Sequence, residues 1–127
     1  MRLWHWKLLH YLPNKQLISQ WRELNSIYKK QPRHILINYV YEYGKSDLYK
    51  YSCMVVDELN RRGINHNFKN WNSYFGGCWP QQLNEPFKNH HTDRYLLQCF
   101  YNLQEKFDRG QSDFSQEIYD RLYKFLF

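Results

Sequence analysis

The stretch from residue 14 to residue 33, NKQLISQWRELNSIYKKQPR, has the pattern of a long amphipathic helix, which limits how the rest of the chain can fold. Four large apolar residues recur in it at helical spacing: Leu17, Trp21, Leu24 and Tyr28. On an α-helix they form one stripe, which must be buried against other elements. We expect Asn14, after Pro13, to cap a helix over residues 14–31 and Pro32 to stop it.

The polar face of this helix is basic and contains a single carboxylate. Its members are Ser19, Arg22, Glu23, Ser26, Lys30 and Arg33. Glu23 is the only Asp or Glu among residues 1–41, and no Lys or Arg stands three or four positions from it to form an ion pair within the helix. An isolated acid on a cationic helix is either an ordinary solvated residue or a catalytic one, and the helix alone leaves both readings open.

The positive charge is concentrated at the start of the chain. The whole sequence has 18 Lys and Arg against 12 Asp and Glu, a formal net charge of +6. Residues 1–33 carry seven of the basic side chains and only Glu23 as an acid, whereas residues 64–127 carry seven of each kind. A charge needed only for solubility would be more evenly scattered, so this placement favours a surface that meets a polyanion.

The remaining pattern predicts a small all-α domain spanning residues 1–127, with three main helices and long irregular loops. Two further long helices are each bounded by a capping residue and a glycine: from Ser46 or Asp47 to Gly63, and from Thr92 to Gly110. A shorter helix begins at Ser112 or Ser115. Residues 34–43 suit a strand or a short helix, and we favour the helix because no partner strand is evident.

Two segments lack a clear helical pattern. Residues 1–13 are expected to form an irregular arm, with Trp4 and Trp6 anchoring it to the core. Residues 64–91 are rich in Asn, Gly and aromatic residues and are expected to form a long loop. A loop of this length in a compact domain is usually functional or wrongly assigned.

The cysteines and the hydropathy pattern argue against a secreted or membrane protein. Cys53, Cys78 and Cys99 are an odd, widely spaced set, so we expect no disulfide framework and a cytoplasmic location. No apolar run approaches the length of a membrane span. The opening MRLWHWKLLHYLP is interrupted by charged and histidine residues and has no cleavage site, so we do not expect a signal peptide.

Familiar catalytic motifs are missing from the sequence. A zinc site could be drawn from His66, Cys78, His90 and His91, but the spacing fits no standard finger, and we expect no metal. Cys99 lies on an apolar helical stripe, so we expect a buried structural thiol and not a nucleophile. The chain's α-amino group remains: with an ordinary pKa of about 7.7–8.0, against about 10.4 for lysine, it is the more natural amine nucleophile at neutral pH.

Several short motifs resemble those of one known family. They are Leu12, Leu17-Ile18, Trp21-Arg22-Glu23-Leu24, His34-Ile35, Asp57-Glu58-Leu59-Asn60-Arg61-Arg62-Gly63-Ile64 and Leu103-Gln104-Glu105-Lys106-Phe107. With them the chain resembles the endonuclease V type of pyrimidine-dimer DNA glycosylase, a small all-α repair enzyme with abasic-site (AP) lyase activity. The opening Met-Arg-Leu-Trp is similar to a bacterial subgroup of that family.

The resemblance implies a site. In that family the α-amine of the first residue attacks C1′ of the damaged nucleotide while a glutamate assists, so here Met1 would supply the amine and Glu23 the acid/base. The side chains expected to contact DNA are Arg2, Arg22, Ser26, Lys29, Lys30, Arg33 and His34. The expected partner is damaged double-stranded DNA, bound by a monomer without a metal or small-molecule cofactor. The aromatic C-terminal segment that meets the lesion in the family is echoed by Tyr119, Tyr123, Lys124 and Phe125, positions that could equally be core.

The chain also departs from the family pattern. Phage members begin Met-Thr and lose the methionine, whereas Arg2 follows Met1 here, and the initiator methionine is expected to stay. The basic connection before His34 is also much shorter. Three alternatives stay open: the same chemistry on another damaged base, a non-catalytic nucleic-acid-binding helical module, and a small protein-interaction domain. The last explains the aromatic residues but not the placement of the charge.

Overall fold

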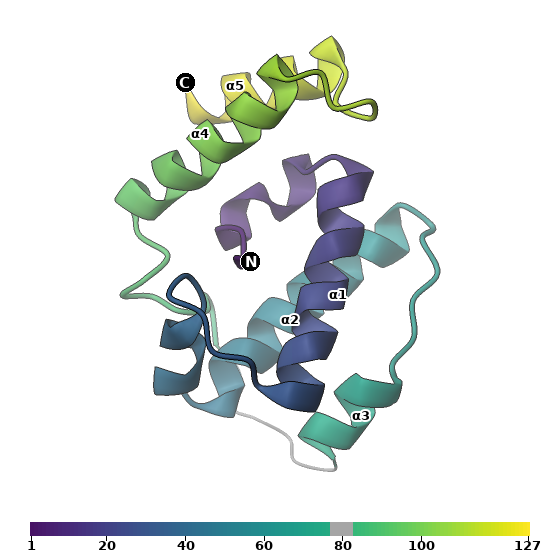
Figure 1. Ribbon diagram of the computed structural model, residues 1–127, viewed down its shortest axis with the longest axis vertical. Helices are drawn as coiled ribbons and strands as arrows, with labels where there is room; N and C mark the ends of the chain where they lie inside the picture. Colours follow the sequence, from purple (N-terminus) through teal and green to yellow (C-terminus); the bar gives the residue numbers. More distant parts are fainter. Residues whose placement is uncertain (77–82) are drawn as a thin grey trace.

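Helices α1 (Asn14–Lys30) and α2 (Lys45–Arg61) pack against each other at the centre of the molecule (Figure 1). The apolar stripe predicted for α1 is buried, with Leu17 and Leu24 fully inaccessible to solvent. The facing stripe of α2 is buried as well: Leu48, Tyr51, Ser52, Val55 and Leu59. The hydroxyl groups of Tyr28 and Ser52 are hydrogen bonded across this interface. The two stripes read from the sequence therefore form the main core.

This computed structural model describes residues 1–76 and 83–127. Besides α1 and α2 its elements are η1 (Trp6–Tyr11), η2 (Asn38–Glu42), α3 (Lys69–Phe75), α4 (Asp93–Asp108) and α5 (Gln116–Leu126), where η marks a 3-10 helix. The described residues contain helices and no strand, which confirms the all-α fold class. None of the helices in the described ranges combines the length and the apolarity that a membrane crossing requires.

The predicted helix ends are partly right. Thr92 and Ser115 cap α4 and α5, and Gly63 and Gly110 follow α2 and α4 with positive φ. The caps assigned to Asn14 and to Ser46 or Asp47 are wrong, because α1 and α2 begin earlier, after Pro13 and Gly44. Two of these side chains bind other partners: Asn14 Oδ1 accepts from Arg62 Nη1 at 2.9 Å, and Asp47 Oδ2 accepts from the Phe87 amide at 2.8 Å.

The long loop expected over residues 64–91 contains a helix, so that prediction was wrong in part. The N-cap residue of α3, Phe68, offers no side-chain cap, and the helix is held by aromatic packing. Phe75 is buried and lies edge-on to Tyr28 at 5.5 Å and to Tyr49 at 5.2 Å. A helix of seven residues stabilised by tertiary contacts leaves little periodicity to detect. The loop residues Cys78 and Trp79 lie outside the described part of the chain.

The N-terminal arm is more regular than expected. Its second half forms η1, while Trp4 is buried and Trp6 half-buried. Arg62, just after α2, donates hydrogen bonds to the carbonyl oxygens of Leu12 at 2.6 Å and His10 at 3.1 Å. The Arg-Gly motif at the end of α2 thus fixes the junction between the arm and α1.

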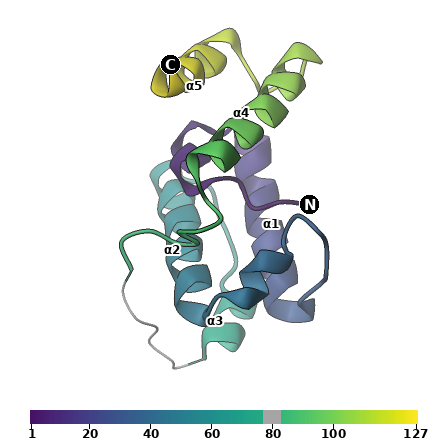
Figure 2. The same cartoon turned by 90° about the vertical axis from the view of Figure 1, so that its left-hand side faces the viewer.

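Helices α4 and α5 lie on the other side of the arm. In both views the arm, drawn in purple, runs between the α4–α5 pair and the α1–α2 pair (Figures 1 and 2). Phe125 of α5 stacks on Tyr11 of η1 with ring centroids 4.4 Å apart. The arm therefore lies between α1–α2, which follow it in the sequence, and α4–α5, which come about 80 or more positions later.

Candidate functional site at the chain's first residue

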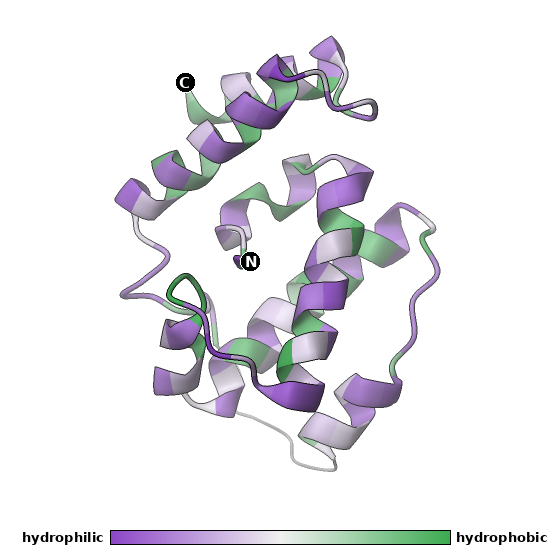
Figure 3. Cartoon of the chain, in the orientation of Figure 1, coloured by the Kyte–Doolittle hydropathy of each residue, from purple (hydrophilic) through white to green (hydrophobic). Residues whose placement is uncertain are grey.

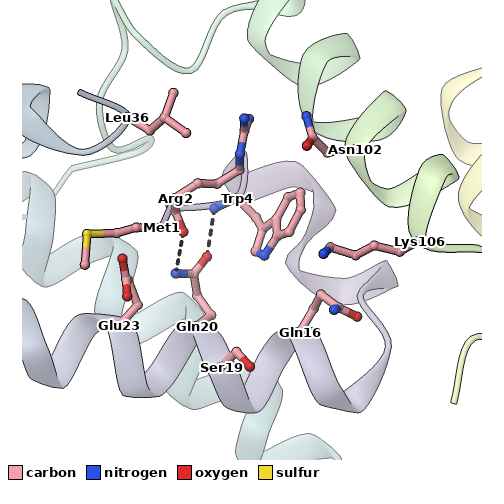
Figure 4. A pocket seen from close by; sticks show the side chains of 10 residues that line it. All are labelled: Met1, Arg2, Trp4, Gln16, Ser19, Gln20, Glu23, Leu36, Asn102 and Lys106. Atoms are coloured by element: carbon pink, nitrogen blue, oxygen red, sulfur yellow. Dashed lines mark hydrogen bonds between the residues drawn. The ribbon is translucent and has the colours of Figure 1, made fainter. Parts of the chain in front are cut away.

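The first residues of the chain are held by a side chain of α1. Gln20 Oε1 accepts a hydrogen bond from the Trp4 amide at 2.7 Å, and Gln20 Nε2 donates to the Arg2 carbonyl oxygen at 3.2 Å (Figure 4). Tyr51 of α2 donates from its hydroxyl group to the Trp4 carbonyl oxygen at 2.6 Å and to Gln20 Oε1 at 3.0 Å. Gln20 is 1% exposed, so these bonds are shielded from water and set the position of the arm on α1.

A second set of bonds comes from the segment around α4. Tyr95 donates from its hydroxyl group to the Leu3 carbonyl oxygen at 2.6 Å, and the Trp6 amide donates to Nδ1 of His91 at 3.2 Å. His91 can accept this bond only when Nδ1 carries no proton, so Nε2 carries the proton and donates to the Tyr39 hydroxyl oxygen at 2.8 Å. Burial lowers the pKa of His91 to about 2, in keeping with a neutral ring.

His5 completes this network within the arm. Its Nδ1 accepts from the Lys7 amide at 3.1 Å, so its Nε2 donates to the His91 carbonyl oxygen at 2.9 Å. Burial lowers the pKa of His5 to about 4. The arm is thus tied to α1, to α2 and to the start of α4 by bonds that require neutral histidines.

A cavity of about 370 Å³ opens between the arm, α1 and α4. Its walls are Met1, Arg2, Trp4, Gln16, Ser19, Gln20, Glu23, Leu36, Asn102 and Lys106 (Figure 4). Asn102 and Lys106 enter from α4 and Leu36 from the turn after α1. The lining mixes a carboxylate, two cations and several amides, which suits a polar or anionic ligand more than a purely apolar one.

Glu23 lies in this cavity with an unused acceptor. Its Oε1 atom is buried and has no hydrogen-bond partner among the residues that the structure describes. Burial raises the pKa of Glu23, and the positive charges of the Met1 amine and of His34 act in the opposite direction. Glu23 as a whole is half-buried, and a raised pKa in a cleft is a property that general acid/base residues often have. Glu23 is thus not a fully solvated residue, because one of its carboxylate oxygens is buried in the cavity wall.

Met1 and Glu23 are brought together. Both line the cavity, and Figure 4 shows the Glu23 carboxylate directed at the first residue. Met1 is 51% exposed, so solvent and a ligand can reach it. Gln20 holds the peptide groups on either side of Leu3, which keeps the first residue beside the cavity that it lines.

The residues predicted to contact DNA lie in two places: on or just after α1, and, for Arg2, in the N-terminal arm. Arg22, Lys29 and Lys30 are exposed on α1, Ser26 is half-buried there, and Arg33 and His34 are exposed in the following turn. Arg2 differs, because it is half-buried, with its guanidinium 5.7 Å from the Trp4 ring and 5.8 Å from the Tyr95 ring. Its Nη1 also donates to Cys99 Sγ at 3.7 Å. Arg2 is therefore partly engaged in holding the arm.

Sequence reasoning missed much of the cavity wall. Gln20 was not among the predicted site residues, yet it holds the arm in place. Asn102 and Lys106 are four residues apart on α4, a spacing that puts them on one helix face. The sequence does not show which face of α4 contacts the arm. The motif over residues 103–107 was the only sequence feature that pointed to this part of α4.

The C-terminal aromatic residues lie apart from the cavity. Tyr119 stacks on Phe107 at 4.3 Å and Phe125 on Tyr11, while Tyr123 is 48% exposed. Two of these rings thus pack within the protein, and none of them lines the cavity. Cys99 is buried with a pKa raised by burial, as expected for a structural thiol. Among residues 1–76 and 83–127 no three His, Cys, Asp or Glu side chains gather as metal ligands would.

The fold and this site define a class: a small all-α protein with a carboxylate-containing pocket at its first residue, beside a basic helix face. A model of the family described as pyrimidine dimer DNA glycosylase matches residues 1–72, which include the arm, α1 and α2. The match covers more than half of the 127 residues, and the chain belongs to this family. No curated protein and no solved structure matches the chain. Family membership implies DNA glycosylase activity and binding to damaged DNA.

Proposed function

We propose that this protein, as one domain over residues 1–127, is a DNA glycosylase with AP-lyase activity on pyrimidine dimers, in which the amine of Met1 is the nucleophile and Glu23 the acid/base. The observation that carries the proposal is the shared cavity of Met1 and Glu23, where the carboxylate has an unused buried oxygen. The family membership supports the glycosylase step in general.

In the first step the neutral amine of Met1 forms a bond to C1′ of the damaged nucleotide while the N-glycosidic bond breaks. The bonding electrons leave with the base, which takes up a proton. Opening of the sugar ring then breaks the bond between C1′ and O4′, protonates O4′ and leaves an iminium ion between Met1 and C1′. Glu23 is placed to stabilise the developing positive charge and to shuttle these protons.

The second step cuts the strand. Glu23 removes a proton from C2′, the electrons shift toward the iminium, and the bond between C3′ and its phosphate oxygen breaks, so that the 3′ phosphate leaves. Addition of water to the remaining imine releases the sugar fragment and returns the free amine of Met1. No metal or other cofactor is required by these steps.

The surrounding cations support binding of a duplex. Exposed Lys and Arg side chains neutralise phosphates and position a protein on DNA. Arg22, Lys29, Lys30 and Arg33 are exposed on α1 or just after it, and Lys106 points into the cavity from α4 (Figure 4). We propose that these side chains, with Arg2, Ser26 and His34, hold the backbone while the damaged nucleotide leaves the stack to reach Met1.

Borohydride trapping on DNA with an abasic site tests this proposal. Reduction of the iminium makes a stable protein–DNA adduct, and mass spectrometry of its peptides gives the attachment point. An adduct on the Met1 amine is expected, and a short N-terminal extension of the chain should abolish it. An adduct on Lys106 would move the chemistry to α4. Tight binding without cleavage of pyrimidine-dimer or abasic-site DNA would favour the non-catalytic module, and cleavage of another lesion only would correct the substrate.

A further inference from the structure

The turn between α1 and η2 exposes two large aliphatic side chains. Ile35 is 85% exposed, more than any other large hydrophobic residue in the described part of the chain, and Leu36 is 38% exposed. The next residue, Ile37, is fully buried. Of these three consecutive aliphatic residues, only Ile37 belongs to the buried core, whereas Ile35 and Leu36 are exposed.

This turn is held in one conformation. The His34 carbonyl oxygen accepts hydrogen bonds from the amides of Ile37 and Asn38, both at 2.9 Å. The His34 amide donates to Asn38 Oδ1 at 2.7 Å, and the Leu36 amide donates to His34 Nδ1 at 3.1 Å. These hydrogen bonds already order the turn. Binding through its aliphatic tip therefore costs little additional conformational entropy.

The base of the turn is anchored as well. The guanidinium of Arg33 lies 4.3 Å from the centre of the Tyr41 ring, and the Tyr41 hydroxyl group donates to the Pro32 carbonyl oxygen at 2.6 Å. Both connections join the turn to η2. The tip is therefore bonded to η2 at its base and projects from it.

The tip lies at the mouth of the candidate site. Leu36 lines the cavity together with Met1 and Glu23. Figure 3 shows the turn as a green segment near the first residue, and Figure 2 shows the same proximity from the side. Arg33 and His34, both exposed, directly precede the tip, and α1 with its basic polar face ends just before them. An apolar projection that follows a basic helix face and Arg33 suits DNA, whose phosphates are anionic and whose stacked bases are apolar.

We propose that Ile35, with Leu36 behind it, is a wedge that enters the base stack of DNA at the lesion and keeps the damaged nucleotide turned toward Met1. Proteins that kink DNA insert Leu, Ile, Phe or Met side chains between base steps, and basic neighbours bind the flanking phosphates. This inference rests on the proposed function and adds the residue that opens the duplex. The wedge replaces the stacking contacts that the displaced nucleotide gives up.

The experiment compares Ile35→Ser with Ile35→Phe and with Leu97→Ser. Leu97 is 38% exposed on α4 and does not line the cavity, so its variant controls for loss of an exposed aliphatic residue. Each protein acts on the same abasic site in duplex and in single-stranded DNA. Fluorescence of 2-aminopurine beside the site in the duplex reports unstacking, and the melting temperature checks that the variants fold.

Ile35→Ser should cleave the duplex at least about tenfold more slowly and lose the 2-aminopurine signal, since unstacking a base step costs a few kcal/mol. Its cleavage of single-stranded DNA should match wild type, because no stack has to be opened there. Ile35→Phe should keep both duplex readouts, and Leu97→Ser should behave as wild type.

Three outcomes would overturn the wedge. Equal duplex cleavage and fluorescence in Ile35→Ser and wild type would reject it while leaving the proposed function intact. An equal loss on duplex and single-stranded DNA would assign Ile35 a role other than opening the stack. Wild-type protein that cleaves neither DNA would remove the proposed function and the wedge together.

Discussion

Gln20 holds the backbone of Trp4 through a hydrogen bond of 2.7 Å that is closed off from solvent, and its other end holds the carbonyl group of Arg2. One uncharged side chain on α1 therefore fixes two peptide groups of the arm. Glu23 lies three residues further along the same helix, so a single helical turn carries both the fastening of the arm and the carboxylate. This arrangement sets the distance between the first residue and the acid.

Gln20→Leu should loosen the arm. The amide of Trp4 and the carbonyl group of Arg2 would lose their partners in a buried setting, which costs about 1–3 kcal/mol of unfolding free energy. Borohydride trapping on abasic DNA should slow by more than the stability loss explains, because the amine is no longer confined. Gln98→Leu, at an exposed position of α4, is the control. Unfolding in urea and the trapping rate are measured together, and a normal trapping rate would contradict the positioning role.

Glu23→Gln should leave DNA binding intact or tighter while strand cleavage falls below detection. Removing a general acid/base costs about 10²–10⁴-fold in rate, and removing a negative charge from a cationic surface favours a polyanion. Glu42→Gln, at an exposed residue of η2, provides the matched control and should cleave normally. Gel shifts and strand-cleavage assays give the two readouts. Unchanged cleavage by Glu23→Gln would reject the catalytic role.

DNA binding should weaken steeply as salt rises. Each phosphate contact contributes a slope of about −0.9 to the plot of log affinity against log salt concentration, so Lys30→Gln should make the slope shallower by about one. Lys69→Gln, on exposed Lys69 at the start of α3 and outside the cavity, should leave the slope unchanged. Fluorescence anisotropy over a range of salt concentrations measures both. A flat response of the wild-type protein would count against the electrostatic argument.

Acid should destabilise the fold in two stages. The pKa values of His5 and His91 are lowered by burial to about 4 and about 2, so the unfolded chain binds more protons than the folded one below about pH 6.5. Their stabilisation is fully present above that pH, and about 2–4 kcal/mol should be lost between pH 7.5 and pH 5. Arg61 and Arg62 lower the pKa of Glu58 to about 2 against the effect of burial, which adds a second loss below about pH 4.5.

Urea unfolding at a series of pH values measures this dependence. His91→Gln should be less stable than wild type at pH 7.5, since it loses the acceptor for the Trp6 amide. Its stability should fall less steeply between pH 7.5 and pH 5, since one titrating group is gone. The same slope in both proteins would show that His91 does not titrate with unfolding.

Arg62→Met should destabilise the fold much more than Arg61→Met. Both arginines pair with Glu58, but the Arg62 side chain is only 14% exposed and also binds the carbonyl groups of the arm, whereas that of Arg61 is 52% exposed. Losing those bonds should cost about 2–4 kcal/mol, because buried Glu58 loses one of its charged partners and the partly buried Leu12 carbonyl group loses its donor. Urea unfolding compares the two variants, and equal losses would contradict the role of Arg62 at the junction of the arm and α1.

The sequence already contains the features that depend on near neighbours. The stripe of α1 from Leu17 to Tyr28, the caps at Thr92 and Ser115 and the glycine stops at Gly63 and Gly110 follow from spacing and backbone preference. The isolation of Glu23 is a local property too. Such features were predictable because each involves residues within a turn or two of one another.

Other features depend on what the segments pack against. α3 was missed because aromatic contacts stabilise it and local periodicity does not, and Asn14 and Asp47 were misassigned because distant partners bind their side chains. The set of residues that line the cavity around Glu23 also depends on tertiary packing. Its walls come from the arm, α1, the turn at Leu36 and the α4 residues Asn102 and Lys106.

By itself, the sequence determined that the chain is helical, that its first quarter is cationic and that Glu23 stands alone there. The tertiary structure decided that the first residue meets Glu23, because the arm is fastened by side chains of α1, α2 and α4 that are far apart along the chain. Periodicity records which face of a helix is apolar. Which elements those faces bury, and what gathers in the space between them, depends on the packing of all the elements together.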